Sequence, residues 1–426
     1  MTATVIVVFA ILGLLNMPLA FALGFASLAA LIASGTEIVI MPQRMMYAVN
    51  SFSLMAIPLF MIAGEIMVKA GILHRLVDFA NSMVGRVQGG LAHATIISGA
   101  ILAAVTGAAV ASASALGSTL VPMLRKYYGD GFTSGLIASA SNLGPIIPPS
   151  NAMIVYALMA GSSVSVGALF IAGIVPGIIL ALGMMALSSI IAKRRGFPLT
   201  GEPFNLREVL GKTRKAFVIF MMPVIVIGGI IGGAFTPTEG AAIAVAYAAF
   251  IGFFVTGEFK LHHLPGVMFR AAVGSAVVAA LIAFASTVTF IFTIDLVPAQ
   301  LAAFLKSVTD SPTAFMIMVM LMLVVVGMFI ESNAAYIMLV PLFAPIAASY
   351  GIDPLWFGFL FVLNLVIGMM TPPVGVLLFV MSGVSGVSMG TMIRETLPFT
   401  ALQFGVLILC FTFPPICLWL PRALGF

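Results

Sequence analysis

The feature that most constrains this chain is the length of its apolar runs, which almost no charged residues interrupt. Charged side chains make up 7% of the 426 residues and hydrophobic ones 62%, whereas about a quarter of the residues of a soluble protein carry charge. The runs also lack the roughly ten-residue alternation of apolar and polar positions that the strands of an outer-membrane barrel show. The sequence therefore predicts an all-α polytopic membrane protein.

The apolar runs form two similar series. A helical crossing needs about 20 apolar residues, and each half of the chain, 1–200 and 201–426, offers five such runs. One run in each half is broken by glycine and proline, at Asn142 to Asn151 and at Gly368 to Gly375. The expected spans are 2–16, 18–35, 52–70, 131–160 (broken) and 164–192, then 215–234, 238–257, 271–295, 355–382 (broken) and 397–420.

Each half also contains one apolar stretch that is too long for a single crossing. A continuous helix over 90–128 or 313–349 would be about 55 Å long, nearly twice the thickness of the hydrocarbon core. Small or polar residues interrupt the first stretch at 106–119 and the second at 327–334. We therefore expect two re-entrant helical hairpins whose tips lie near the middle of the membrane.

The two halves are predicted to be inverted repeats. Leu-Val-Pro at 120–122 returns at 339–341, and Ile147-Pro148-Pro149 corresponds to Thr371-Pro372-Pro373. Because five is an odd number of crossings, the second half must start on the opposite side of the membrane from the first. Inverted repeats with broken helices are typical of secondary transporters.

The distribution of basic residues predicts the orientation. The loop at 193–215 is rich in lysine and arginine and should be cytoplasmic. With that loop inside, 15 of the 18 basic residues fall on the cytoplasmic side, and only Arg44, Lys306 and Arg422 lie outside. Both termini are then periplasmic. The net charge of +5 thus reflects membrane topology, and no nucleic-acid partner is expected.

The hairpin tips and helix breaks are the candidate binding sites. A helix that ends at mid-membrane leaves backbone groups that protein, water or a ligand must satisfy. Helix N-termini favour carboxylates, while hydroxyl, amide and carbonyl oxygens suit Na⁺. We predict that Ser112, Ser150, Asn151 and Asn333 contact an organic anion. The predicted Na⁺ ligands are Ser114, Asn142, Gly144, Pro145, Gly327, Glu331, Ser332, Gly368, Met370 and Thr371.

Single polar residues are weaker indicators than this paired pattern, because Ser and Thr in membrane helices often only pack or bond to their own backbone. Glu331 is the one carboxylate expected deep in the membrane, where an ionisable group is functional by default. Its role stays open between a cap of the second hairpin helix, a direct Na⁺ ligand and a protonatable coupling group. Glu65, four residues before Lys69, is interpreted as a helix-surface ion pair.

Enzymatic functions are not expected. The sequence has no Gly-x-x-x-x-Gly-Lys-Ser/Thr phosphate loop, no His-Glu-x-x-His and no convincing Ser/His/Asp group. We predict a transporter with no cofactor other than Na⁺ as coupling ion. A channel is the competing class, but hairpins that enter from opposite faces and pair with broken helices favour alternating access.

The sequence also resembles a known family, the large membrane (M) subunits of tripartite ATP-independent periplasmic (TRAP) transporters. The resemblance runs from the Asn16-Met17-Pro18 turn to Thr396-Leu397-Pro398-Phe399. Its most specific segments are Gly144-Pro-Ile-Ile-Pro-Pro-Ser150, Gly351-Ile-Asp-Pro354 and Gly368-Met-Met-Thr-Pro-Pro-Val-Gly375. The first hairpin departs from the family pattern, since position 112 is serine where many relatives have aspartate.

The resemblance implies an elevator-type transporter of the ion-transporter superfamily in the bacterial inner membrane. A transport domain, 90–160 plus 313–382, would slide against a scaffold formed by the remainder, driven by a Na⁺ gradient. The implied partners are a small four-helix membrane subunit (Q type) and a periplasmic substrate-binding protein (P type). The substrate would be an organic acid anion, with sialic acid favoured over C4-dicarboxylates and other carboxylates. The alternative is a self-sufficient Na⁺- or H⁺-coupled anion symporter.

Overall fold

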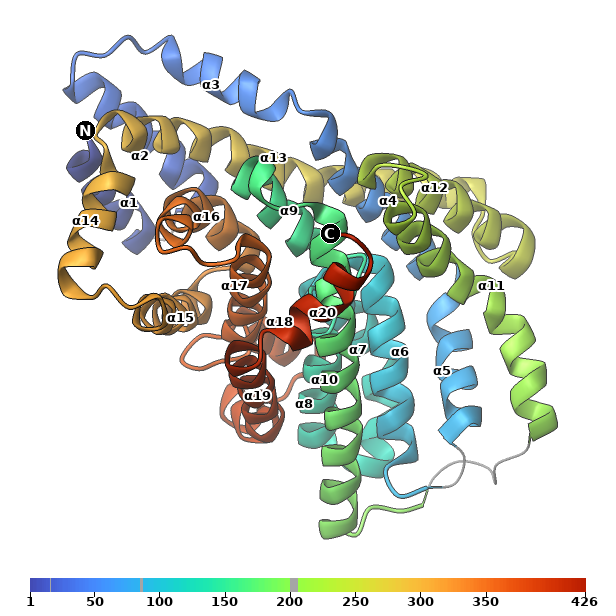
Figure 1. Cartoon of the computed structure of the whole chain (residues 1–426). Helices are drawn as coiled ribbons and strands as arrows, with labels where there is room; N and C mark the ends of the chain where they lie inside the picture. The colour runs from blue at the N-terminus through green and yellow to red at the C-terminus, as the bar shows by residue number, and fades with distance from the viewer. Residues whose placement is uncertain (16, 85–86, 200–205) are drawn as a thin grey trace.

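The protein is built from helices (Figure 1). The computed structural model describes residues 1–15, 17–84, 87–199 and 206–426, and no strand occurs in these ranges. The prediction of an all-α membrane protein is confirmed. The boundary between the two expected halves and the middle of the basic loop lie at 200–205, outside the described residues.

Seven helices within the described ranges are long and apolar enough to cross a membrane, judged by length and composition. Further apolar helices of 10–17 residues accompany them, including both halves of the second broken helix. The seven are Phe52–Lys69, Val166–Arg194, Pro237–Thr256, Leu261–Ile294, Pro312–Phe329, Ser332–Ser349 and Met389–Thr412.

The first half of the chain begins with five helices that precede the hairpin. Two of them, α3 and α5, were not expected from the sequence, because short amphipathic segments carry no long apolar run. A 3₁₀ turn, Phe52–Met55, leads into α4. The five helices are α1 (Thr2–Leu14), α2 (Leu19–Ala33), α3 (Ile40–Val49), α4 (Ala56–Lys69) and α5 (Ile72–Val84).

The long stretch at 90–128 consists of two helices, α6 (Gly90–Thr106) and α7 (Ala109–Tyr128), which pack together. The turn lies at Gly107, whose φ of +62° is a left-handed conformation that glycine adopts without a steric penalty. The tip therefore lies at the beginning of the expected polar interruption. The broken helix follows as α8 (Asp130–Ser141) and α9 (Asn151–Ala160), and the long α10 (Val166–Arg194) completes this half.

The second half also places a hairpin and then a broken helix after its first helices, but four helices precede its hairpin instead of five, and the short α20 is added at its end. A π-helical turn, Ile251–Thr256, extends α12. The predicted last span, 397–420, is wrong in its boundaries: the helix continues through Pro398 and the break comes at Pro414. The helices are α11 (Leu206–Ile231), α12 (Pro237–Phe250), α13 (Leu264–Ile294), α14 (Val297–Val308), α15 (Pro312–Phe329), α16 (Ser332–Ser349), α17 (Pro354–Gly368), α18 (Val376–Ser385), α19 (Met389–Thr412) and α20 (Pro415–Ala423).

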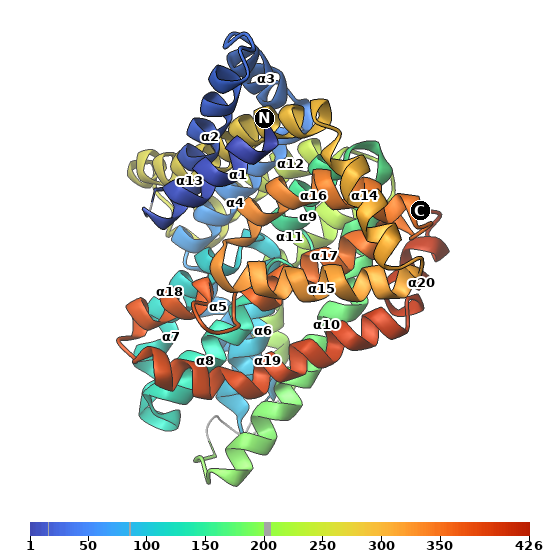
Figure 2. The ribbon, with the colours of Figure 1, turned by 90° about the vertical axis from the view of Figure 1, so that its left-hand side faces the viewer.

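The hairpins and the broken helices interlock across the two halves. The second helix of each hairpin packs against the second part of the other half's broken helix, α7 against α18 and α16 against α9. Helices α10 and α19 pack against each other and against α17, and α19 also packs against α8 (Figure 2). On the other side of the molecule, the 31-residue α13 packs against α2, α3 and α4 (Figure 1).

One predicted ion pair is wrong. The carboxylate of Glu65 does not pair with Lys69 on its own helix but accepts a hydrogen bond from Arg270 Nε of α13 at 2.6 Å. Spacing along one helix identifies neighbours on that helix only, so the partner from α13 could not be read from the sequence. The pair joins α4 to α13.

Candidate transport site

The tip of the first hairpin is bonded to the first helix break. The amide of Asn151 donates to the Gly107 carbonyl at 3.3 Å. A Cβ atom on Gly107 would lie 2.8 Å from the Asn151 nitrogen, so only glycine allows this approach. Asn151 and Ser112 are both buried beside this tip. The structure thus brings two predicted substrate residues together.

Ser150 shapes the break itself. Its hydroxyl donates to the Pro145 carbonyl at 2.7 Å and accepts from the Met153 amide at 3.3 Å, so it caps α9. A serine at this position satisfies one of the free amides of a helix N-terminus. The Ser150 hydroxyl therefore connects the break, at Pro145, to the first turn of α9 and fixes the point at which the break ends.

The second tip and the second break are joined in the same way. The amide of Gly375 donates to the Met328 carbonyl at 3.0 Å. Next to this bond, Gly327 and Gly368 pack backbone to backbone: a Cβ on Gly368 would lie 2.6 Å from the Cα of Gly327. Thr371 continues the break, and its hydroxyl donates to the Ile367 carbonyl at 2.9 Å. Each half therefore has one tip fixed to its own break.

Glu331 caps the second hairpin helix. One carboxylate oxygen accepts from the amides of Asn333 at 2.9 Å and Ala334 at 3.3 Å. The other accepts from the Asn333 side-chain amide at 2.9 Å and from the Ser332 hydroxyl at 3.4 Å. A carboxylate at a helix N-terminus is stabilised by these amides and by the helix dipole. Of the three roles that the sequence leaves open for Glu331, the structure shows that of the N-cap of α16.

Asn142 is fixed at the end of α8 by both hydrogens of its amide. Its Nδ2 donates to Gln403 Oε1 at 2.8 Å and to the Val366 carbonyl at 3.1 Å. Its Oδ1 is buried and has no hydrogen-bond partner. Buried polar atoms are nearly always paired, so an unpaired one requires an explanation. The amide cannot flip to satisfy Oδ1 without losing both donor bonds.

Two more asparagines present the same feature. The Oδ1 atoms of Asn333 and Asn364 are buried without a partner, while the Asn364 Nδ2 donates to the Met320 carbonyl at 2.9 Å. An amide oxygen held in this way is a suitable ligand for a hard cation. Among the described residues, no group of three or more His, Cys, Asp or Glu side chains could hold a metal, so any ion here would rely on neutral oxygens together with Glu331.

Not all predicted residues gather at the tips and breaks. Ser114 lies on the other face of α7 from Ser112 and lines a separate cavity beside α4 and α13. Met370 is buried in the second break. Sequence reasoning also missed Gln403, in α19, and Asn364, in the middle of α17. Neither lies within the helix breaks at 142–151 and 368–375, and only the fold brings Gln403 to Asn142.

Comparison with known proteins identifies the family. Residues 6–416 match the family described as the tripartite ATP-independent periplasmic transporter, DctM component. The chain belongs to this family. It is therefore a large permease of the TRAP type, as the motifs in the helix breaks indicated, and it is a multi-pass membrane protein rather than an enzyme.

Three relatives match most of this permease, and for two of them the match also covers most of the relative. It is 37% identical to the sialic acid TRAP transporter large permease protein SiaM of Vibrio cholerae, over 97% of each chain. It is 39% identical to the C4-dicarboxylate large permease DctM of Pseudomonas aeruginosa, over 88% of this chain and 87% of the relative. The isethionate TRAP transporter permease protein DctMQ of Oleidesulfovibrio alaskensis is 38% identical over 96% of this chain and 64% of its own.

A solved structure shares the fold of the permease. The YdaH transporter of Alcanivorax borkumensis aligns with a TM-score of 0.62 over 89% of this chain and 87% of its own. The two sequences are 16% identical. At this identity the match shows the architecture and does not extend to the substrate.

Proposed function

We propose that this permease imports an organic acid anion across the bacterial inner membrane by Na⁺ symport, with an elevator movement. The observation that carries the proposal is the pair of tip and break junctions, which contain buried, unpaired amide oxygens at Asn142 and Asn333. A bound Na⁺ would satisfy the Asn142 oxygen, and a hydrogen-bond donor of the substrate would satisfy the Asn333 oxygen. The substrate would lie between the junctions, near Ser112, Ser150, Asn151 and Asn333.

The predicted cation ligands divide between the two junctions. In the first, Asn142, Gly144 and Pro145 would supply oxygens from the break. In the second, Glu331, the carbonyls at Gly368 and Met370, and the Thr371 hydroxyl would contribute. Neutral oxygens, with few full charges, bind Na⁺ weakly enough for release on each cycle. Ser114 would approach the ion only through a movement of α7, since it faces another cavity.

The moving body proposed from the sequence, 90–160 plus 313–382, is extended by the packing. Helices α10 and α19 both pack against α17, and α19 also packs against α8, inside the cluster of hairpins and broken helices. If the moving domain ended at residue 160 and at residue 382, α10 and α19 would have to slide against the helices on which they pack during transport. We therefore include α10 and α19 in the transport domain and propose that α1, α2, α4, α11, α12 and α13 form the scaffold. The equivalent pairs α7–α18 and α16–α9 support two inverted repeats. The basic residues of the loop at 193–215 support periplasmic termini.

Substrate and partners are proposed from the relatives. Two relatives carry sialic acid in their names, one from Vibrio cholerae and one from Haemophilus influenzae, and sialic acid is the favoured substrate. We propose a periplasmic binding protein (P type) as donor of the anion and a four-helix Q-type subunit in the membrane. A relative whose name joins M and Q in one chain supports the second partner.

Uptake into proteoliposomes tests the proposed function. The permease and its Q-type partner would be reconstituted together and given radiolabelled sialic acid, with an inward Na⁺ gradient and the binding protein. We expect accumulation only when Na⁺ and the binding protein are both present. A K⁺ gradient of equal size is the matched control. Gradient-driven uptake without the binding protein would instead establish the self-sufficient symporter, and uptake with K⁺ alone would exclude Na⁺ coupling.

Replacing Glu331 with glutamine tests the cap of α16. Glutamine keeps one acceptor oxygen but leaves the side-chain amide of Asn333 without its present partner. We expect a loss of stability of about 1 kcal/mol, typical of a weakened N-cap, and slower uptake. Membrane insertion should be unchanged in a fractionation assay. Uptake at the wild-type rate and unchanged thermal unfolding would reduce Glu331 to a packing residue.

A further inference from the structure

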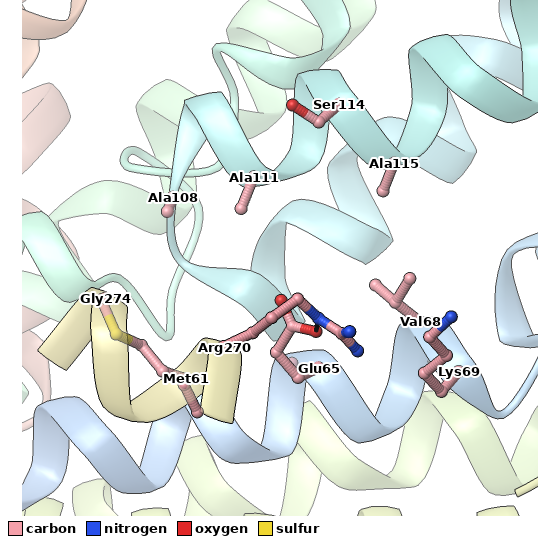
Figure 3. Close-up of a pocket in the computed structure, with 12 residues that line it drawn as sticks. Met61, Glu65, Val68, Lys69, Ala108, Ala111, Ser114, Ala115, Arg270 and Gly274 are labelled. Atoms are coloured by element: carbon pink, nitrogen blue, oxygen red, sulfur yellow. Dashed lines mark hydrogen bonds and ion pairs between the residues drawn. The ribbon is translucent and has the colours of Figure 1, made fainter. Parts of the chain in front are cut away.

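A cavity of about 560 Å³ lies outside the two junctions, between α4, α13 and the hairpin helix α7 (Figure 3). Its volume is within the range of ligand pockets, about 300–1,000 Å³. None of the four residues predicted to contact the substrate lines it. Its walls come from both proposed bodies, since α7 belongs to the transport domain and α4 and α13 belong to the scaffold.

The charged residues of this cavity are all on the scaffold side. Lys69 and Glu65 come from α4, and Arg270 comes from α13. The Arg270 guanidinium is paired with Glu65 at 2.6 Å, which leaves one positive charge on the lining, at Lys69. Ionisable side chains on membrane helices are rare and generally mark ion or substrate pathways. A cleft with low-dielectric walls also strengthens the field of such a charge.

The opposite wall is small and neutral. Ala108, which precedes α7, and Ala111 and Ala115 of α7 face the cavity. In Figure 3 they lie across the cavity from the side chains of α4 and α13, with Ala115 opposite Val68. These positions begin the first turns of α7, where the helix N-terminus adds partial positive charge. Because the alanine side chains are short, space for a ligand remains between α7 and the cationic side chains of Lys69 and Arg270.

The ion pair between Arg270 and Glu65 is accessible to a ligand that could replace Glu65 as the partner of Arg270. The two side chains retain exposed fractions of 44% and 30%, so a ligand can reach both. A carboxylate that enters the cavity finds Lys69 and can compete with Glu65 for the Arg270 guanidinium, which binds carboxylates through two parallel hydrogen bonds.

We propose that this cavity is a second binding station for the carboxylate of the transported anion, with Lys69 and Arg270 as its ligands and Glu65 as their internal competitor. The proposal deepens the proposed function and rests on it for the identity of the anion. The station lies next to Ser112 along α7, on the side that the positive-inside rule makes cytoplasmic. It would receive the anion between the hairpin site and the cytoplasm.

Thiol labelling in detergent tests the charge of the station without any gradient. Both native cysteines, Cys410 and Cys417, are buried and free, so an Ala111→Cys variant offers the accessible thiol. We expect an anionic methanethiosulfonate to react about tenfold faster than a cationic one of similar size, as expected for steering by a local charge. Lys69→Gln should remove this preference and Glu65→Gln should increase it.

The matched control is Arg44→Gln. Arg44 lines a different cavity, of about 810 Å³, at the opposite end of α13, so its loss should leave the labelling of Ala111→Cys unchanged. Ala115→Cys replaces Ala111→Cys if the latter does not fold. Equal rates for the two reagents in the wild-type background, or a preference that Lys69→Gln does not alter, would overturn the station.

Protection by ligands tests the binding itself. Sialic acid and succinate would be added separately at millimolar concentration during labelling. We expect at least one of them to slow the reaction severalfold, and Arg270→Gln to abolish that protection. If none protects, the station is refuted. If protection is found but proteoliposome uptake does not depend on Na⁺, the station stands and the proposed coupling fails, so the two proposals are tested separately.

Discussion

Gly368→Val is expected to abolish uptake and to reduce the amount of folded permease. A Cβ at this position would lie 2.6 Å from the Cα and 2.9 Å from the carbonyl carbon of Gly327. Both are backbone atoms, so no side-chain rotation can relieve the contact. Overpacking of a buried contact costs about 1–3 kcal/mol or more, and here it would also push the second tip away from its break.

Gly383→Val is the matched control for this substitution. Gly383 lies in α18, and a Cβ there would meet nothing within 4 Å. The same side chain is thus introduced into the same half of the protein without a steric conflict. Size-exclusion chromatography of both variants, followed by uptake, compares them directly. Wild-type yield and uptake for Gly368→Val would show that the contact can relax and that the junction is not rigid.

Asn142→Ala is expected to raise the Na⁺ concentration for half-maximal uptake by about tenfold, equivalent to about 1.4 kcal/mol. The substitution removes the unpaired Oδ1 proposed to bind the cation. Gln403→Met should act in the same direction with a smaller effect, because the Asn142 amide would lose one of its two anchors. The maximal rate at saturating Na⁺ should change less than the half-saturating concentration.

A buried residue one turn away provides the control for the Asn142 experiment. The Ser139 hydroxyl donates to the Gly135 carbonyl within α8, so Ser139→Ala should leave the Na⁺ dependence unchanged. Titration of uptake against Na⁺ at constant ionic strength measures all three variants. An unaltered half-saturating concentration in Asn142→Ala would remove this residue from the cation site, whatever its effect on the maximal rate.

The sequence was most informative where a local pattern alone determines the structure. Proline and glycine end helices through their own geometry, so both breaks were predicted close to where they occur: α8 ends at Ser141, and α17 at Gly368. The excess length of 90–128 and 313–349 likewise predicted a pair of helices in each stretch. The class of protein followed from composition and the family from the motifs in the breaks.

The remaining features depend on contacts between distant segments. The partner of Glu65 is 205 residues away, and Gln403 reaches Asn142 across 261 residues. A single sequence contains no pattern that predicts either of these long-range contacts. The short helices α3, α5 and α14 were missed because amphipathic segments of this length resemble polar connections. The unpaired oxygens on which the proposed cation site rests could be found only after every partner had been assigned.

The bonds that fix each hairpin tip to its break limit which residues around the junctions can change during evolution. Both join main-chain atoms, Asn151 nitrogen to Gly107 oxygen and Gly375 nitrogen to Met328 oxygen. On the donor side only proline lacks the required hydrogen. On the acceptor side any residue supplies a carbonyl, although at position 107 the close approach of Asn151 also requires glycine. The other side chains around the junctions can therefore change, and with them the substrate of the permease, while the main-chain bond between each tip and its break is kept.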